Sequence, residues 1–228
     1  MNVAIIPARG NSKRIPGKNI KVFHDKPMIA WSILAASESK CFDRIIVSTD
    51  NEEIANIAIS YGAEVPFLRP KELSDDFTGT TPVVMHAVNC LIDSGLNIKN
   101  VCCIYPTAPF LIKDYLIRAL QLLDQHKVDY CFSVGKFSSP IQRALRLNDQ
   151  GKCIMVYPEN FNLRSQDSFD AYHDAGQFYW GTKNAWILGK EVFNSNSLPF
   201  ILPPERVQDI DTLDDWKHAE LMMKSLLS

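Results

Sequence analysis

Long hydrophobic runs are missing from this chain of 228 residues, and no stretch approaches the ~18 apolar residues that a membrane-spanning helix requires. The opening residues, MNVAIIPAR, lack both the length and the preceding basic charge of a secretory signal peptide. An excess of positive charge is also missing, since the formal net charge is −2 and the isoelectric point lies near 6.2. These absences favour a cytoplasmic protein that binds neither membranes nor nucleic acid.

The six cysteines include no C-x-x-C pair, and no histidine lies at zinc-finger spacing from them. Several cysteines stand among apolar neighbours, as in VCCIY at residues 101–105, which is typical of reduced thiols in a protein core. No triad or metal pattern is formed by His24, His86, His126 and His218. The sequence therefore predicts core cysteines and no histidine- or cysteine-based metal centre.

Short apolar runs alternate with stretches of helical spacing over the first two thirds of the chain. The apolar runs predict strands at residues 3–6, 44–48, 101–105 and 130–134. Helices are predicted at residues 27–37, within 49–62 (capped by Thr49 or Asp50), and at 80–91 and 113–123. This β-α-β-α order predicts an α/β fold whose mostly parallel sheet binds ligands at the carboxyl ends of its strands.

The alternation of strand and helix patterns stops after Lys136. Residues 141–161, IQRALRLNDQGKCIMVYPENF, alternate apolar and polar side chains around Asn148–Gly151, which predicts a β-hairpin. Such an excursion often meets a partner subunit, although the pattern is equally consistent with a plain surface hairpin. The order resumes near residues 177–188, and a final helix is expected at 213–227. We therefore predict one domain, residues 1–228, with an insertion at about 137–175.

The loop after the first strand is strongly basic, and no acidic residue precedes Asp25. Its five cationic side chains are Arg9, Lys13, Arg14, Lys18 and Lys21. The chain lacks G-x-G-x-x-G and G-x-x-x-x-G-K-[ST], which argues against a dinucleotide fold and a P-loop ATPase. Gly10 and Gly17 let the backbone turn and approach a ligand, and Asn11 tolerates a left-handed conformation. The pattern is consistent with an oligophosphate site or with a solvated basic loop.

Two acids stand close together near the end of the chain, in QDIDTLDDW. Asp209 and Asp211 are two residues apart, so in an extended segment they point to the same side. Two carboxylates on one face without cationic partners repel each other, and a divalent metal relieves that repulsion. The other interpretation is a helix cap with an acidic first turn, which suits Asp214 and Asp215 better.

The stretch IIPARGNSKRIPGKN, residues 5–19, resembles the motif of the cytidylyltransferases that activate nine-carbon keto-sugar acids, the CMP-sialic acid synthetase family. The similarity extends to residues 42–73, with an L-R-P motif at Arg69, and covers residue 2 to about 216. It implies a Rossmann-like α/β/α fold with a dimerising insertion. In that family the basic loop wraps the triphosphate of CTP, and D-x-D binds metal.

The resemblance also implies a set of site residues. The nucleotide-binding residues are then Pro7, Ala8, Arg9, Ser12, Lys13, Lys18, Asn19, Arg69 and Thr80. Of these, Arg9, Lys13 and Lys18 would have catalytic roles by stabilising the transferring phosphorus and the departing pyrophosphate. One or two Mg²⁺ ions would be bound by Asp209 and Asp211.

The sugar-binding stretches resemble the branch of the family that acts on pseudaminic acid. YPTAPF, residues 105–110, has Tyr105 where N-acetylneuraminate enzymes usually carry glutamine. Residues 164–180, RSQDSFDAYHDAGQFYW, are similar to the pseudaminate branch, and Arg164 suits a sugar carboxylate. The full set of candidates is Tyr105, Arg164, Gln166, Asp167, His173, Asp174, Gln177 and Tyr179.

These inferences predict a CTP-dependent homodimeric enzyme that forms CMP-pseudaminate and pyrophosphate for surface glycans or flagellin. A related transferase for N-acetylneuraminate, legionaminate or a 3-deoxy-octulosonate is the nearest alternative. A non-catalytic nucleotide-binding module, or one that binds nucleic acid, is an alternative of a different class. The presence of both the basic loop and the D-x-D pair argues against such a module.

Overall fold

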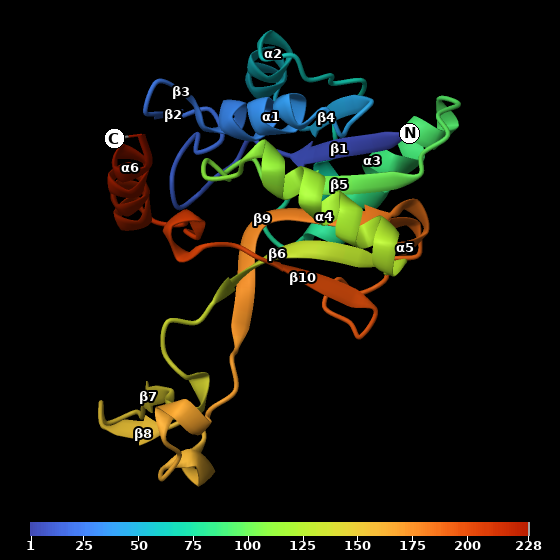
Figure 1. Ribbon diagram of the computed structural model, residues 1–228. Coiled ribbons are helices and arrows are strands. Elements are labelled where there is room, and N and C mark those ends of the chain that lie inside the picture. The colour runs from blue at the N-terminus through green and yellow to red at the C-terminus, as the bar shows by residue number, and fades with distance from the viewer. Residues whose placement is uncertain (228) are drawn as a thin grey trace.

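A six-stranded sheet organises the protein in the computed structural model, which describes residues 1–227 (Figure 1). The strand order is β10-β6-β9-β5-β1-β4, and β9 alone runs antiparallel to its neighbours. The bounds of the six strands are β1 Asn2–Pro7, β4 Arg44–Ser48, β5 Asn100–Ile104, β6 Tyr130–Lys136, β9 Tyr172–Thr182 and β10 Ser197–Ile201. The predicted mostly parallel α/β sheet is thus confirmed.

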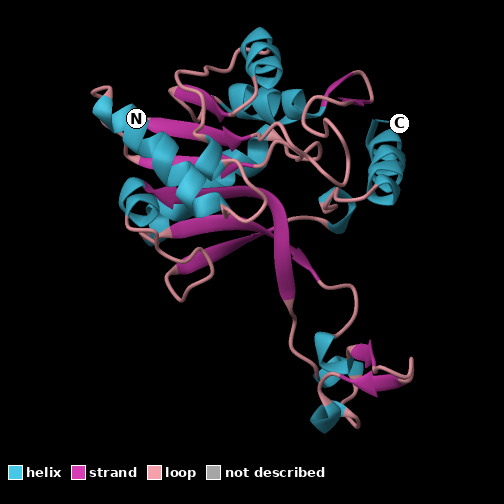
Figure 2. Ribbon diagram, turned by 180° about the vertical axis from the view of Figure 1, so that it is seen from behind, coloured by secondary structure: helices cyan, strands magenta, loops and turns pink. Residues whose placement is uncertain are grey.

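Helices cover both faces of this sheet (Figure 2). Their bounds are α1 Met28–Ser39, α2 Glu52–Ser60, α3 Thr80–Asp93, α4 Lys113–His126, α5 Lys183–Ile187 and α6 Leu213–Leu227. Alternate residues of β1 point to opposite faces, so Ala4 and Ile6 pack with α1, α2 and α4, while Val3 and Ile5 pack with α3. The arrangement is the predicted three-layer α/β/α fold.

The predicted N-cap of α2 was wrong. Asn51 caps this helix by accepting a hydrogen bond from the Ile54 N–H at 3.0 Å. Thr49 instead accepts a bond from the backbone N–H of Asn51, and Asp50 accepts one from Gly10. The two residues are thus held in the turn after β4, beside the basic loop.

The excursion comprises residues 137–171, between β6 and β9, and projects away from the body (Figure 1). It contains the predicted hairpin, with β7 Leu145–Leu147 paired to β8 Cys153–Met155 around the Asn148–Gly151 turn. β9 already begins at Tyr172, so the expected insertion boundary near residue 175 falls inside the sheet strand. Within the described residues no helix is both long and apolar enough to cross a membrane.

Two further features hold the loops of the site in place. A small ribbon pairs β2 (Val22–Phe23) with β3 (Lys26–Pro27) at the end of the basic loop. Helix α6 packs on this ribbon, since Trp216 lies edge-on to Phe23 with ring centroids 5.4 Å apart. The last helix is therefore joined to the first loop, and the D-x-D segment that precedes it lies beside that loop.

Candidate active site

The basic loop, residues 8–21, lies at the carboxyl end of β1 and borders a cavity of about 570 Å³. The cavity is lined by Pro7, Arg9, Ser12, Lys13, Arg14, Lys18, Asn19, Asp76, Phe77, Pro106 and Thr107. Most of the residues predicted for the triphosphate are therefore brought together. Ala8, which was predicted to lie along the nucleotide, does not line this cavity, because its side chain is buried in the core and its N–H is bonded to Ser48 in β4.

The basic loop has a defined backbone conformation that is fixed by contacts with the rest of the protein. Gly17 has a positive φ of 64°, and a Cβ on Gly10 would lie 3.0 Å from the Asn51 side chain. Asn19 is buried and donates a hydrogen bond to the Arg9 carbonyl at 2.9 Å. Asn11 does not use the left-handed region that its residue type allows. Gly17 thus adopts the turn conformation predicted for it, whereas the close approach seen at Gly10 is to Asn51.

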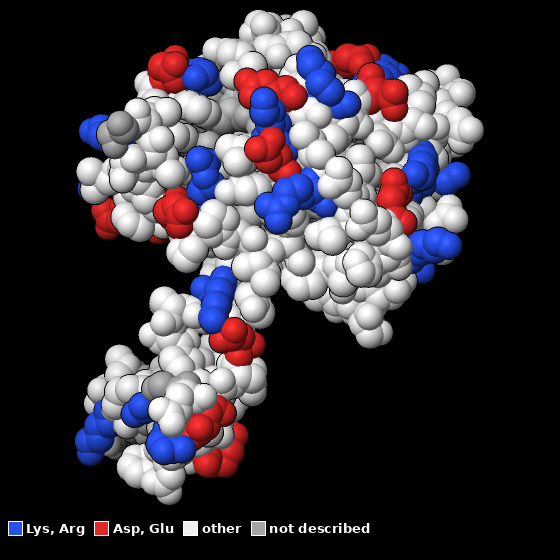
Figure 3. Space-filling view, viewed as in Figure 1, with Lys and Arg blue, Asp and Glu red and all other residues white. Residues whose placement is uncertain are grey.

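Acidic residues distant in sequence neutralise part of this loop. Asp76, in the segment before α3, pairs with Arg9 at 2.8 Å and with Lys13. The Lys13 and Arg9 cations hold the pKa of Asp76 below its ordinary value. On the face shown in Figure 3, basic and acidic side chains are interspersed over the described residues. This arrangement suits a discrete anion with several oxygens better than an extended polyanion.

A second cavity of about 300 Å³ continues from the first and shares Pro7, Arg9, Asp76 and Pro106 with it. Arg69 lines this cavity, although only 4% of its side chain is exposed. Its nearest anion is Asp50 at 3.7 Å, and Nε and Nη2 have no hydrogen-bond partner among the described residues. Buried donors without partners indicate where the acceptor atoms of a ligand fit.

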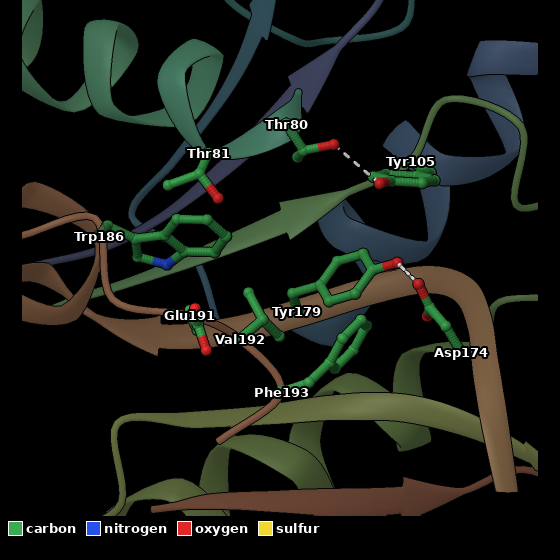
Figure 4. A pocket seen from close by; sticks show the side chains of 9 residues that line it. All are labelled: Thr80, Thr81, Tyr105, Asp174, Tyr179, Trp186, Glu191, Val192 and Phe193. Atoms are coloured by element: carbon green, nitrogen blue, oxygen red, sulfur yellow. Dashed lines mark hydrogen bonds between the residues drawn. The ribbon is translucent and has the colours of Figure 1, made fainter. Parts of the chain in front are cut away.

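A third cavity, of about 530 Å³, shares Thr80 and Tyr105 with the second (Figure 4). Its walls are Thr80, Thr81, Tyr105, Asp174, Tyr179, Trp186, Glu191, Val192 and Phe193. Burial raises the pKa of Tyr105 and of Tyr179, so both phenols are neutral hydrogen-bonding groups. The three cavities form one trough, from a cationic end to an end that contains carboxylates and aromatic rings.

Three of the predicted sugar-binding residues, Tyr105, Asp174 and Tyr179, meet in this third cavity. The others lie elsewhere in the single chain. Arg164 pairs with Asp167 at 2.8 Å on the excursion, where Gln166 is also exposed. The excursion projects away from the body of the protein (Figure 2), and none of these three side chains is among the residues that line the trough.

His173 and Gln177 also lie outside the cavity. The His173 ring packs on Phe137, and a Cβ at Gly135 would lie 2.8 Å from its Nε2. Gln177 is 2% exposed and donates its side-chain N–H to the Arg206 carbonyl. Both side chains thus help to hold β9 against β6 and the segment before α6.

The sequence analysis missed several residues that line the trough. Glu191, Val192 and Phe193 follow α5 in a loop without a recognisable motif, and Trp186 had the pattern of an ordinary core residue. Asp76 stands in DDFTGT, residues 75–80, and the sequence analysis gave it no role. Its two cationic partners lie in a different loop, so only the tertiary structure reveals its position.

The acidic pair lies beside the basic loop, and one premise about it was wrong. Asp211 has cationic partners, since it pairs with Arg14 at 2.8 Å and with Lys18 at 3.4 Å. Partial desolvation and the nearby Asp211 carboxylate raise the pKa of Asp209, so repulsion between the two acids persists. No cluster of three or more metal-ligating side chains occurs in residues 1–227. Two carboxylates still suit Mg²⁺, which usually keeps waters and binds substrate phosphates as well.

The acidic residues that follow have the capping role expected for them. Asp215 accepts hydrogen bonds from the Thr212 N–H at 2.7 Å and from the Asp211 N–H at 3.1 Å. Thr212 in turn accepts one from the Asp215 N–H at 3.2 Å, which completes a reciprocal cap at the start of α6. Asp209 remains outside this cap, and the Asp211 carboxylate is directed at the basic loop.

Comparison with known proteins agrees with this geometry. The model of the family Cytidylyltransferase matches residues 3–208. A pseudaminic acid cytidylyltransferase of Campylobacter jejuni is 44% identical over 223 residues, covering 98% of this chain and 96% of the relative. An N-acylneuraminate cytidylyltransferase of Escherichia coli is 32% identical, covering 95% of this chain and 51% of the relative. The structure of CMP:2-keto-3-deoxy-manno-octonic acid synthetase complexed with CTP is similar in fold, with a TM-score of 0.72, 15% identity and 98% coverage of both chains.

Proposed function

This chain belongs to the cytidylyltransferase family, and from that premise we propose that it transfers CMP from CTP to pseudaminic acid, releasing pyrophosphate. The trough supports this proposal most directly, because it joins a cationic cavity to one rich in hydrogen-bond acceptors and aromatic rings. A triphosphate suits the cationic cavity, and an uncharged part of a sugar suits the third cavity, with its acceptors and aromatic rings. The relative named for pseudaminic acid supports the choice of sugar.

CTP occupies the first two cavities in this proposal. Arg9, Lys13 and Lys18 face the phosphates, and Ser12 and Asn19 lie in the same cavity. The buried donors of Arg69 face the base, whose O2 and N3 atoms are acceptors, and Thr80 closes that end. CTP must displace Asp76 from its two cations, because the carboxylate lies where the phosphate oxygens need them.

Asp209 and Asp211 are the residues that would hold one or two Mg²⁺ ions. When bound there, the metal would neutralise phosphate charge and lower the pKa of the attacking hydroxyl. The placement of the pair supports this role, since Lys18 reaches both the Ile210 carbonyl and Asp211. Removing Mg²⁺ with a chelator should abolish turnover, and restoring it should recover the activity.

The chemical step is a displacement at the α-phosphorus of CTP. The anomeric oxygen of the sugar acid forms the new P–O bond as the bond to pyrophosphate breaks, and the hydroxyl proton passes to solvent. Lys18 extends from the basic loop to the D-x-D segment, where it stabilises charge on the transferring phosphorus. Arg9 and Lys13 stabilise the leaving pyrophosphate. The protein acts mainly by positioning the reactants and by compensating charge.

The active enzyme is a homodimer in this proposal. Large apolar side chains are exposed on the excursion, where Leu147 is 68%, Phe161 74% and Phe169 68% exposed. We propose that a second copy buries them and that Arg164 on the excursion serves the partner's trough, where its guanidinium would pair with the sugar carboxylate. Sedimentation of the full chain should give a dimer, and a monomer with full activity would contradict this part. We also propose a cytoplasmic location for the enzyme, because CTP is supplied there.

The decisive experiment follows pyrophosphate release from CTP and Mg²⁺ with pseudaminate, N-acetylneuraminate, a legionaminate and a 3-deoxy-octulosonate. We expect the highest kcat/KM with pseudaminate, and much lower turnover when UTP or ATP replaces CTP. Preference for N-acetylneuraminate would overturn the sugar assignment. Mg²⁺-dependent CTP binding without turnover on any sugar acid would instead favour a non-catalytic nucleotide-binding module.

A further inference from the structure

A line of hydroxyl groups crosses the third cavity from the nucleotide end to Asp174 (Figure 4). Thr80 Oγ1 lies 2.8 Å from Tyr105 Oη, and the Tyr105 and Tyr179 rings pack with centroids 5.3 Å apart. Tyr179 Oη donates to Asp174 Oδ2 over 2.6 Å. Side chains from α3, from the end of β5 and from β9 thus form one hydrogen-bonding wall.

An irregularity in β9 brings Asp174 to this wall. Phe132 of β6 is opposite Tyr179, but Val134, two residues later, is already opposite Asp174. In a regular strand, residues five apart point to opposite faces and are separated by roughly 16 Å, so they cannot touch. The bulge removes that separation. Gly176, with a φ of 61°, directs its N–H to Asp174 Oδ1 at 2.9 Å and so fixes the carboxylate.

The Asp174 carboxylate also sets the direction of its hydrogen bond with the Tyr179 hydroxyl. A carboxylate only accepts, so the Tyr179 proton is committed to Asp174 and the Tyr179 oxygen can only accept from other groups. Of the two phenols, Tyr105 is therefore the one that can donate across the pair. Thr80 Oγ1 and Tyr105 Oη share a hydrogen bond in which either hydroxyl can be the donor. The Tyr179 proton thus points toward Asp174, and the lone pairs of the Tyr179 oxygen remain to accept from a ligand.

Building on the proposed function, we propose that Asp174 is a positioning residue that makes this wall an acceptor surface, which binds the N–H and O–H groups of the sugar acid and repels its carboxylate. Glu191 extends the acceptor surface. It lines the same cavity, and its carboxylate has no hydrogen-bond or ion-pair partner in residues 1–227. No lysine or arginine lines this cavity among those residues. The sugar carboxylate therefore points out of the cavity, and acylamino N–H groups point into it.

The aromatic walls complete this assignment. Trp186 uses its indole N–H on the Val101 carbonyl at 3.2 Å, so it presents an apolar surface to the cavity. Phe193 is 61% exposed at the rim, beside Val192. The acceptor wall fits the amide N–H of an acylamino group, while these apolar surfaces fit its methyl.

The test compares Asp174→Asn and Asp174→Ala with the wild type. Asparagine keeps the shape of the aspartate side chain but can donate to Tyr179, so it can reverse the direction of the hydrogen bond between the two residues. Alanine removes this hydrogen-bond partner of Tyr179 altogether. We expect both variants to raise the KM for pseudaminate about tenfold or more, with kcat much less affected. The Kd for CTP, measured by calorimetry without sugar, should stay within about twofold. Asp124→Asn, which removes a distant surface carboxylate paired with Lys99, is the charge control.

Several outcomes would overturn the proposal. An asparagine variant with wild-type KM, beside a defective alanine variant, would show that shape matters and proton direction does not. An equal rise in the CTP Kd would show a general structural defect. Tyr179→Phe gives a second measurement, because adding Asp174→Asn to it should produce no further rise in KM. Absence of turnover by the wild type with every sugar acid would refute the proposed function itself, and not only this inference.

Discussion

Lys18 should contribute to folding as well as to catalysis, because it fastens the basic loop to the D-x-D segment. Its ammonium donates to the Ile210 carbonyl at 2.6 Å and lies 3.4 Å from an Asp211 oxygen, while only 16% of the side chain is exposed. Lys18→Met keeps most of the side-chain volume and removes the charge and all three donors. The Ile210 carbonyl then loses its donor in a place where little water can replace it.

The magnitude follows from the burial of this contact. Charge-assisted hydrogen bonds contribute about 1.5–3 kcal/mol, and Asp211 keeps Arg14 as a partner, so we expect a loss of about 2 kcal/mol. For a chain of this size, that lowers Tm by roughly 4–8 °C. Arg14→Met removes the other ion pair of Asp211, but the Arg14 side chain is 67% exposed. This matched variant should cost no more than about 0.5 kcal/mol.

The assay is thermal unfolding of both variants without nucleotide, followed by pyrophosphate release at saturating CTP and Mg²⁺. Lys18→Met should also lower kcat by about 10²-fold or more, since it removes a charge from the transferring phosphorus. Lys18→Arg should recover much of the stability. Equal Tm losses in Lys18→Met and Arg14→Met would refute the reasoning, because the argument depends on their difference in burial.

Four other predictions follow from the structure. Asp76→Asn should tighten CTP binding about two- to fivefold in calorimetry, because it removes an internal competitor for two cations, and weaker binding would contradict this. Asp211→Asn should reduce turnover by orders of magnitude at fixed Mg²⁺, and wild-type kinetics would refute its role with the metal. Gly181→Ala should destabilise the fold by about 1–3 kcal/mol in urea unfolding, because the new Cβ would lie 2.6 Å from two buried aromatic rings, whereas Gly79→Ala meets open space. Native protein treated with a thiol reagent should react first at Cys153, the exposed cysteine, because burial raises the pKa of several other thiols, and rapid reaction of those thiols would indicate a looser core.

Local patterns were sufficient for most elements of the fold. The strand at Arg44–Ser48 and the helix at Leu213–Leu227 have the bounds predicted for them, because each is a short segment with one clear periodicity. β10 was missed, since Pro199 in SLPFI argues against a strand. The proline is tolerated because β10 is at the edge of the sheet, a position that depends on the order of all six strands.

The sequence by itself determined the two charged segments of the site. A basic, glycine-containing loop after a strand predicts an anion site, and a D-x-D pair predicts a metal site, because both signals lie within a few residues of chain. Only the tertiary structure decided which basic and acidic side chains of the two segments pair with each other. Arg14 and Asp211 are 197 residues apart, and the packing of α6 on the β2–β3 ribbon brings them together.

The sugar end of the trough depended still more on tertiary structure. Asp174, Gln177 and Tyr179 stand close together in one strand, so all were equal candidates from the sequence. The irregular pairing of β9 with β6 turns Asp174 and Tyr179 toward the cavity and Gln177 toward the Arg206 carbonyl. A strand's side-chain direction reverses with every residue, so the register shift at β9 decided which of them form the site. Gly176 is consistent with a bulge in this strand, but the size of the shift depends on the pairing with β6.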